Sequence, residues 1–596
     1  MKKLLSIMLC FTLLCFGAAW AEPAPAETAA EPHKVETRQL PVYNAAAKLI
    51  YEAMPVYYLD GVSDLPYVDV GEFVKFMNAL YSDDNNPRDN YMYEYNEGDK
   101  ICSITYLYNN SSALVDFGSK DIFFSNFNTF AINPIKSQID ILGSSGFNAS
   151  TGLPELFKRT TNVRIERPGQ PRMIPLNDYG IPIIQQDGKN LLPLHTTFDL
   201  LVGKPSGLNI LVYCNGKQIV MGGKDTVAES QQDPLTGAEI SVPTEIGKQF
   251  YAEGPARRSE ALAAYGVAEL CMELDTFYGL KDAHNLNSFT DLLLNTDFYD
   301  KLADPDSKVA DEAVNDFINF YMDDLHSAYL YNSYLTGVST ELEGHGVGFS
   351  RKADFANTDR YGKVLKEIMP EGRNAYQEIG NTAYVTFDTF AADGIDYYNL
   401  DLSTPDCIKD TISLVLYCHN QITRENSPVQ NVVLDMSMNT GGAADAAVYV
   451  IGWFLGEAVI TNMDTFTGAQ GTATYLVDTN RDREFDDSDS LASRYNLYCL
   501  TSPLSFFCGN LVPWVFKTSG LVTLIGDTTG GGSCVVMPMT TAWGTTFQMS
   551  GNSRLAFVKN GSFYDVDRGV EPDVVLTRIK SFFEREKLTD MINNLK

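Results

Sequence analysis

Short apolar runs alternate with helical patterns over the C-terminal half of the chain, and this alternation constrains the fold more than any other feature. Four runs of strand type, each bounded by turn residues, lie at 384–387, 431–436, 497–500 and 521–526. Helical patterns lie between them at 443–455 and 509–518. Strands that alternate with helices form a parallel or mixed sheet covered on its faces. We therefore predict an α/β core.

A chain of 596 residues is too long for one ordinary domain. Before the core, a mixed region precedes a long stretch with helical apolar spacing, so the fold class is predicted as multidomain α+β with a C-terminal α/β core. The predicted organisation is a signal peptide at 1–21, a linker at 22–40, an N-terminal α+β region at 41–223, a linker at 224–244, a helical region at 245–345 and the α/β core at 375–580.

The first 21 residues predict export. Lys2 and Lys3 precede an apolar stretch at 4–17, and Ala19-Trp20-Ala21 is a small-x-small cleavage signal. This pattern is typical of a secretory signal peptide, and its apolar stretch is shorter than the roughly 20 residues that span a bilayer. We expect a secreted or extracytoplasmic protein without a transmembrane helix.

The composition excludes some classes of partner and ligand. The formal net charge is −31, which disfavours nucleic acid and anionic membranes as partners. Eight cysteines follow the signal peptide without a CxxC pair, and the six histidines are equally scattered. We therefore predict neither a disulfide framework nor a zinc site.

Four segments of the predicted core carry polar or glycine-rich turns after a strand. The first runs from Asp435 through Gly441 and Gly442, where backbone N–H groups near a helix start can cradle an oxyanion. The others are a strand–turn–helix segment at 500–510, a glycine-rich loop at 524–534 and a closing Gly-Val-Glu-Pro-Asp at 569–573. Each segment alone is weak evidence, because a glycine pair after a strand is usually a tight turn.

In this order the four segments resemble the C-terminal processing, or tail-specific, family of serine peptidases over roughly 310–580. The resemblance implies a core of the ClpP/crotonase-like type, a protein or peptide substrate and no required cofactor. The segment Asp323-Asp324-Leu325-His326-Ser327 is similar to the signature of the tricorn-like branch, which uses His as its base. It nominates His326 as general base, whereas His195, His284, His345 and His419 are interpreted as surface or core residues. The glycine-rich loop holds no Lys, so a Ser–Lys dyad is not expected.

The nucleophile turn departs from the family. Relatives with the same Cys-Gly-Asn ending read Ser-Phe-Ser-Cys-Gly-Asn, with the second Ser as nucleophile, whereas this chain places Phe507 there. Phe cannot attack a carbonyl. Ser505, two residues earlier, is the nearest hydroxyl and the candidate nucleophile, and Cys508 and Ser533 are further candidates.

The third catalytic member and the oxyanion donors follow from the same resemblance. The family's acid precedes the closing motif, where Asp565 and Asp567 flank Val566. We nominate Asp567 to accept the His326 N–H. The backbone N–H groups of Gly441 and Gly442, with that of the residue after the nucleophile, are the expected oxyanion donors.

Two functions remain open from the sequence. The first is a secreted serine-type peptidase in which Ser505 attacks, His326 takes the proton and Asp567 orients the imidazole. The second is a pseudo-protease that binds polypeptides but has lost its nucleophile to Phe507. Fold membership does not by itself establish turnover. The residues leave the substrate and the oligomeric state open.

An acidic segment between two predicted strands resembles a calcium loop. Oxygen-bearing side chains stand at positions 1, 3, 5, 9 and 12 of an EF-hand-like spacing. They are Asp478, Asn480, Asp482, Asp486 and Asp489. The glycine expected at position 6 is replaced by Arg483, and an acidic surface loop is the alternative interpretation. Ca²⁺ is therefore the one metal that the sequence suggests.

Overall fold

The computed structural model of this chain describes most residues beyond position 31. The described ranges are 32–80, 89–130, 156–159, 164–205, 209–232, 238–251 and 256–595. The predicted signal peptide lies outside them. None of the helices formed by the described residues has the length and apolar content that a membrane crossing requires.

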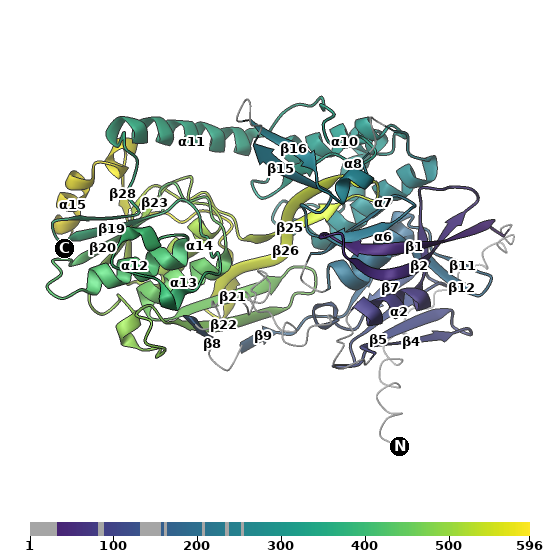
Figure 1. Cartoon of the computed structure of the whole chain (residues 1–596), viewed down its shortest axis with the longest axis horizontal. Helices are drawn as coiled ribbons and strands as arrows, with labels where there is room; N and C mark the ends of the chain where they lie inside the picture. The colour runs from purple at the N-terminus through teal and green to yellow at the C-terminus, as the bar shows by residue number, and fades with distance from the viewer. Residues whose placement is uncertain are drawn as a thin grey trace, which may run out of the picture. The chain divides into compact units, whose positions relative to one another are not determined.

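The apolar runs of the C-terminal half form the predicted α/β core. Its sheet has the order β18-β19-β20-β23-β24-β28, and from β19 onward neighbouring strands are parallel. The strands are β18 (Tyr376–Ile379), β19 (Thr382–Thr386), β20 (Asn431–Asp435), β23 (Asn496–Thr501), β24 (Val522–Gly526) and β28 (Val574–Val575). The crossover helices are α12 (Thr411–Thr423), α13 (Ala444–Leu455) and α14 (Cys508–Ser519). Figure 1 shows these helices beside the sheet, and the predicted α/β alternation is confirmed.

Alternating side chains cover the two faces of this sheet. Val432 and Leu434 of β20 pack in one apolar cluster with α12, α13 and α14. Val433, between them, packs on the other face with Leu588 and Ile592 of α15 (Arg585–Asn594). A strand buried on both faces reads as an unbroken apolar run, which is why the sequence signal was clear. Assignment of the core to the ClpP/crotonase-like type stays a prediction.

A second sheet adjoins the core and is organised by the long strand β26 (Thr546–Lys559). The first part of β26 pairs with β17 (Ala328–Tyr331), and its later part pairs with β21 (Ala458–Asp464). The other strands of this sheet are β22 (Gln470–Val477), β25 (Cys534–Thr540), β27 (Ser562–Tyr564), β8 (Phe157–Arg159) and β9 (Arg164–Arg167). Because β17 follows His326 directly, β26 fixes that residue's position against the rest of the sheet.

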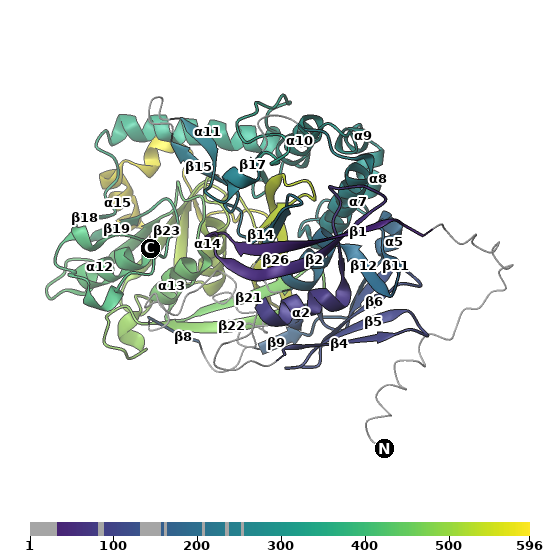
Figure 2. The same ribbon diagram turned by 45° about the vertical axis from the view of Figure 1, so that its right-hand side comes forward.

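The N-terminal part contains two mixed or antiparallel sheets. The larger has the order β11-β12-β3-β2-β1-β14-β13, with strands Ile184–Gln186, Lys189–Pro193, Tyr67–Asp69, Leu49–Leu59, Val35–Asn44, Ile219–Gly222 and Leu211–Cys214. The smaller has the order β10-β7-β6-β5-β4, with strands Arg172–Ile174, Asp121–Phe124, Ser112–Asp116, Ile101–Tyr106 and Tyr91–Asn96. Helix α2 (Val70–Leu80) buries Phe73 and Met77. Figure 2 shows α2 beside β4 and β5.

Helices occupy most of the stretch from 260 to 322. They are α7 (Glu260–Phe277), α8 (Phe289–Leu294), α9 (Phe298–Leu302), α10 (Ser307–Asp316) and the π-helical turn η6 (Phe317–Met322). Helix α11 (Phe349–Ile368) follows. One apolar core joins α7 to the N-terminal sheets and to Trp543.

Two segments expected as linkers contain strands instead. β1 begins at Val35, inside the expected linker 22–40, because its backbone pairs with β2 and β14. The expected linker 224–244 holds the antiparallel strands β15 (Ala228–Gln232) and β16 (Glu239–Pro243). Both segments are polar, so neither shows the apolar pattern that predicts a strand. Their strands form nevertheless, because cross-strand backbone pairing needs few apolar side chains.

A buried histidine in the core makes the fold sensitive to acid. His419 on α12 is 3% exposed, and its Nδ1 accepts a hydrogen bond from Trp453 Nε1 at 3.1 Å. Burial lowers the pKa of His419 from 6.5 to about 4. The unfolded chain therefore binds the proton first, so this residue's contribution to stability is complete above pH 6.5 and is lost as the pH falls toward 4.

We expect the free energy of unfolding to fall by roughly 3 kcal/mol over that window from this residue. Thermal unfolding measured at pH 7 and in steps down toward pH 4 tests this. His419→Gln keeps an acceptor for Trp453 but cannot be protonated there, so its stability should depend less on pH. An equal pH dependence in the variant and the wild type would contradict the assignment.

Candidate active site

His326 lies in a short turn between η6 and β17. Asp323, with a left-handed backbone (φ 49°), ends η6, and its carboxylate accepts the N–H groups of Ser350 and Arg351 at the start of α11. The carboxylate of Asp324 accepts the His326 N–H at 3.1 Å. On the other side, Gln548 of β26 donates to the His326 carbonyl at 3.0 Å. The two aspartates of the predicted signature therefore shape the turn that presents the imidazole.

The imidazole of His326 is buried, and only one of its nitrogens has a partner. Nδ1 lies 3.5 Å from Ser550 Oγ, whereas Nε2 has no hydrogen-bond partner. Burial lowers the pKa of His326, although the negative charges of Asp324 and Asp567 act to raise it. The side chain is therefore neutral at pH 7, the state in which Nε2 can take a proton. Sequence reasoning missed Ser550, which has no motif around it.

Phe507 occupies the position that the family gives to its nucleophile. It caps helix α14 with φ 50° and ψ −110°, a strained conformation for a non-glycine residue. Its ring meets the His326 ring edge-on with centroids 4.9 Å apart, and the Phe506 ring lies 4.6 Å away. Gly532 permits this packing, because a Cβ there would lie 2.8 Å from Phe506 and 3.2 Å from His326 Cε1. Two partly exposed phenyl rings thus occupy the space beside the base.

The structure does not bring Ser505 to His326. The Ser505 side chain is fully buried; its hydroxyl donates to the Met436 carbonyl at 2.7 Å and accepts the Ser502 N–H at 2.9 Å. The first bond holds the turn before α14 against the end of β20, and the second closes the turn itself. The expected Ser505–His326 hydrogen bond is not formed, because residue 507 rather than 505 stands at the strained corner.

The other candidate nucleophiles are also engaged elsewhere. The Cys508 thiol donates to the Gly442 carbonyl at 3.2 Å, and burial raises the pKa of this thiol. Ser533 Oγ lies 3.1 Å from Asp567 Oδ1 and accepts from Arg554 Nε at 2.9 Å. A thiol held protonated and a serine that faces Asp567 and Arg554 are poor nucleophiles.

Asp567 contacts Ser533 rather than His326. Its Oδ1 accepts the Ser533 N–H at 3.1 Å, and its carbonyl accepts the Gly532 N–H at 3.0 Å. Asp565 pairs with Arg554. Asp567 is thus close enough to His326 to influence the imidazole charge, but the structure shows no hydrogen bond between them.

The expected oxyanion donors are only partly available. The Gly441 N–H already donates to Asn439 Oδ1 at 2.9 Å. Gly441 and Gly442 both have positive φ, and a Cβ on Gly441 would lie 3.0 Å from Phe507 Cβ. Cys508 begins α14, where an N–H lacks an intrahelical acceptor. The glycine turn after β20 therefore lies against Phe507 at the start of α14.

The acidic segment folds as a set of local turns. Asp478 accepts the N–H groups of Arg481 and Arg483, and Asp489 accepts those of Thr479 and Asp486. Asn480 Oδ1 accepts the Asp482 N–H at 2.8 Å, and Asp486 accepts that of Ser488 at 2.7 Å. These bonds occupy the carboxylates without a cation. Calcium binding by this segment stays a prediction.

The sequence of the core matches a known family. Residues 381–576 match the model of peptidase family S41. The match lies inside the segment 375–580 that the motifs marked, and it contains residue 507 and the glycine turns but not His326. No curated protein matches the chain.

Several solved structures are distantly similar. The photosystem II D1 C-terminal processing protease is 18% identical, with 34% of this chain and 45% of that chain covered and a TM-score of 0.25. A putative peptidase from Parabacteroides merdae is 15% identical, with 54% and 90% covered and a TM-score of 0.33. Mature CPAF is 11% identical, with 56% and 97% covered and a TM-score of 0.35. These TM-scores are too low to support a conclusion on function.

Proposed function

We propose that this chain, whose residues 381–576 belong to peptidase family S41, is a secreted protein that binds extended polypeptides beside His326 and does not hydrolyse them. One observation carries the second half of this proposal. Phe507 stands at the strained helix start where a nucleophile is required, and His326 Nε2 faces no hydroxyl or thiol within hydrogen-bond distance among the described residues.

The binding half of the proposal rests on the family and on the two aromatic rings. Phe506 and Phe507 are partly exposed next to the glycine-rich turn at 530–532. An apolar surface beside backbone amides suits an extended peptide, whose side chains and carbonyls alternate. The alternative function is a serine-type peptidase that uses Ser505, His326 and Asp567. It is favoured by the family and by a His326 held in its base form, but it requires Ser505 to leave Met436 and Ser502.

Fluorescein-labelled, unfolded casein tests both functions. We expect fluorescence anisotropy to show binding by the wild type, and gel analysis of the same mixture to show intact casein. Phe506→Ala should weaken binding roughly tenfold, the effect of losing an aromatic anchor. Tyr108→Ala, which removes an aromatic side chain that is 66% exposed in the N-terminal part, is the matched control and should bind like the wild type.

The competing outcomes are distinct. Casein cleavage by the wild type that disappears in Ser505→Ala would establish the peptidase and overturn the proposal. Casein that stays intact and unbound would remove the binding function as well.

A further inference from the structure

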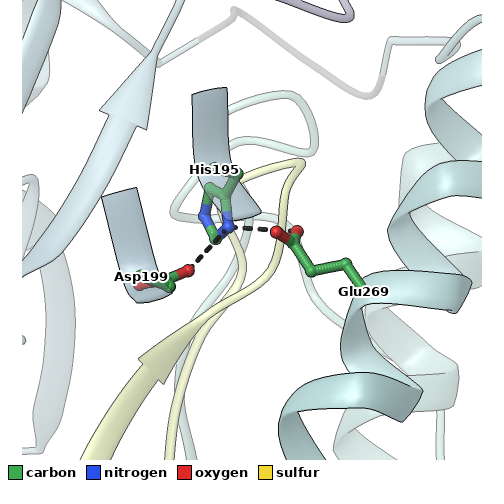
Figure 3. Close-up of side chains that lie close together, drawn as sticks. All are labelled: His195, Asp199 and Glu269. Carbon is green, nitrogen blue, oxygen red and sulfur yellow. Dashed lines mark ion pairs between the residues drawn. The ribbon is translucent and has the colours of Figure 1, made fainter. Parts of the chain in front are cut away.

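Three buried ionisable side chains meet far from the candidate active site. His195 lies on α6 (Leu194–Phe198), Asp199 begins the π-helical turn η4 (Asp199–Gly203) that continues it, and Glu269 lies on α7. His195 Nδ1 is 3.0 Å from Asp199 Oδ2 and 3.0 Å from Glu269 Oε2. Figure 3 shows both carboxylates directed at this nitrogen. Asp199 and Glu269 are each 1% exposed, and His195 is 9% exposed.

The atoms that face one another in this cluster lack ordinary hydrogen bonds. His195 Nδ1 and Nε2, both Asp199 oxygens and Glu269 Oε2 are buried without a hydrogen-bond partner. Although two oxygens lie at hydrogen-bond distance from Nδ1, neither is aligned with its N–H direction. By contrast, Glu269 Oε1 accepts from Tyr265 at 2.7 Å and from Thr196 at 3.0 Å. Only the inward atoms are unsatisfied, which is costly in a protein interior.

The formal charges around the cluster are unbalanced. A third buried carboxylate, Glu273, lies one turn along α7 and also has an unpartnered oxygen. The buried cation among them is Lys204, whose Nζ is 3.9 Å from Asp199 Oδ1. Burial raises the pKa of Glu273 and so favours its neutral form. With a neutral imidazole at His195, Asp199 and Glu269 then carry two negative charges against the single ammonium of Lys204. Buried charges are normally paired or coordinate a metal.

We propose that His195, Asp199 and Glu269 bind one divalent transition-metal cation. Ligand atoms about 2.1 Å from a cation lie about 3.0 Å apart at the right angles of octahedral coordination and about 3.4 Å apart at tetrahedral angles. The 3.0 Å spacing of Nδ1 from both oxygens therefore suits an octahedral ion such as Mn²⁺ directly, and tetrahedral Zn²⁺ after small side-chain shifts. Oxygens placed in this way flank the nitrogen rather than align with its N–H. One imidazole and two carboxylates suit Zn²⁺ and Mn²⁺. Among the described residues, this is the one group of three such ligands that converges.

Such an ion would join two parts of the chain that are distant in sequence. His195 and Asp199 are one helical turn apart in the N-terminal part of the chain. Glu269 lies on helix α7, which comes after that part in the sequence. A small cavity lined by Leu65, Leu194, His195, Tyr265, Tyr334 and Thr541 adjoins the imidazole. All three ligands are buried and apolar side chains surround them, so the ion would stabilise the fold rather than contact a substrate.

Metal analysis of the full chain tests the site. The purified protein is stripped with a chelator, dialysed against Zn²⁺ or Mn²⁺ and freed of excess metal. We expect about one ion per chain by atomic emission and a higher unfolding temperature for the loaded form. Glu269→Gln and His195→Gln should each lower the bound metal at least about tenfold, because each removes a ligand. His345→Gln, which alters a histidine paired with the single carboxylate of Asp316, should change nothing.

The alternative occupant of the cluster is a proton. Burial disfavours an imidazolium at His195, but Glu269 and Asp199 outweigh it and raise this pKa in the absence of metal. A folded wild type that binds neither ion, or nitrogen NMR showing His195 doubly protonated in excess Zn²⁺, would overturn the proposal. Since substitution can unfold a buried site, Co²⁺ absorption is recorded on the unaltered chain. No new ligand-field band there would also overturn it.

Discussion

Phe507→Ser is expected to give this chain the peptidase activity that, under the proposed function, the wild type lacks. The substitution places a hydroxyl at the strained start of α14, beside a His326 whose Nε2 is unpartnered. It also removes the ring that now packs edge-on against that imidazole. Because general-base catalysis contributes roughly 10²–10⁴-fold, casein hydrolysis should rise by at least about 10² over the wild type. Release of labelled peptides from casein measures the gain.

Phe507→Ala is the matched control, because it removes the ring without supplying a hydroxyl. It should stay inactive, and so should Phe507→Ser combined with His326→Ala, since the serine and its base act as one unit. A Phe507→Ser variant no more active than Phe507→Ala would show that the remaining geometry cannot support hydrolysis. The weak points would then be Asp567, which faces Ser533, and Gly441, whose N–H faces Asn439.

The activity gained should depend on pH in a defined direction. Burial lowers the pKa of His326 below 6.5, and the neutral imidazole is the active base. Hydrolysis should therefore be at its plateau at pH 7 and fall only at more acidic pH, with a midpoint below 6.5. In the same variant, Ser550→Ala should lower the rate, because Ser550 Oγ is the group nearest to Nδ1.

Local patterns predicted the alternation of strands and helices in the core. The parallel strands were visible because each is buried on both faces and ends at a turn. The nomination of Phe507 came from the resemblance to relatives that share the Cys508-Gly509-Asn510 ending. The sequence pattern could not show which way the Ser505 hydroxyl points. Ser505 bonds to Met436, which is 69 positions away and directly follows β20.

Pairings between distant segments were out of reach of sequence reasoning. Ser550 reaches His326 across 224 positions, and it does so only because β26 pairs with β17. The spacing of His195 and Asp199 places both on one helical face, but Glu269 comes from another helix. Calcium binding by the acidic segment stays a prediction. Its spacing suggested convergence on a cation, whereas short aspartate side chains also bond readily to nearby backbone N–H groups.

Asp435→Asn is expected to destabilise the core more than any other single change considered. Asp435 ends β20, is fully buried, and pairs with Arg585 of α15 and with Arg373 at 3.4 Å. Burial opposes its charge, but the two guanidinium groups prevail and lower the pKa of Asp435 to about 2. Removing the carboxylate leaves the buried Arg585 guanidinium without an anion and Arg373 with Asp388 alone, which costs roughly 3–5 kcal/mol.

Calorimetric unfolding of the variant measures this loss, and hydrogen exchange of α15 shows whether the helix detaches. Asp359→Asn is the control, because Asp359 pairs with Lys363 on an exposed helix face and such pairs contribute only about 0.3–0.5 kcal/mol. Adding Arg585→Met to Asp435→Asn should recover part of the stability, since one unpaired charge is then gone. If Asp435→Asn unfolds like Asp359→Asn, the buried carboxylate does not hold α15 to the sheet.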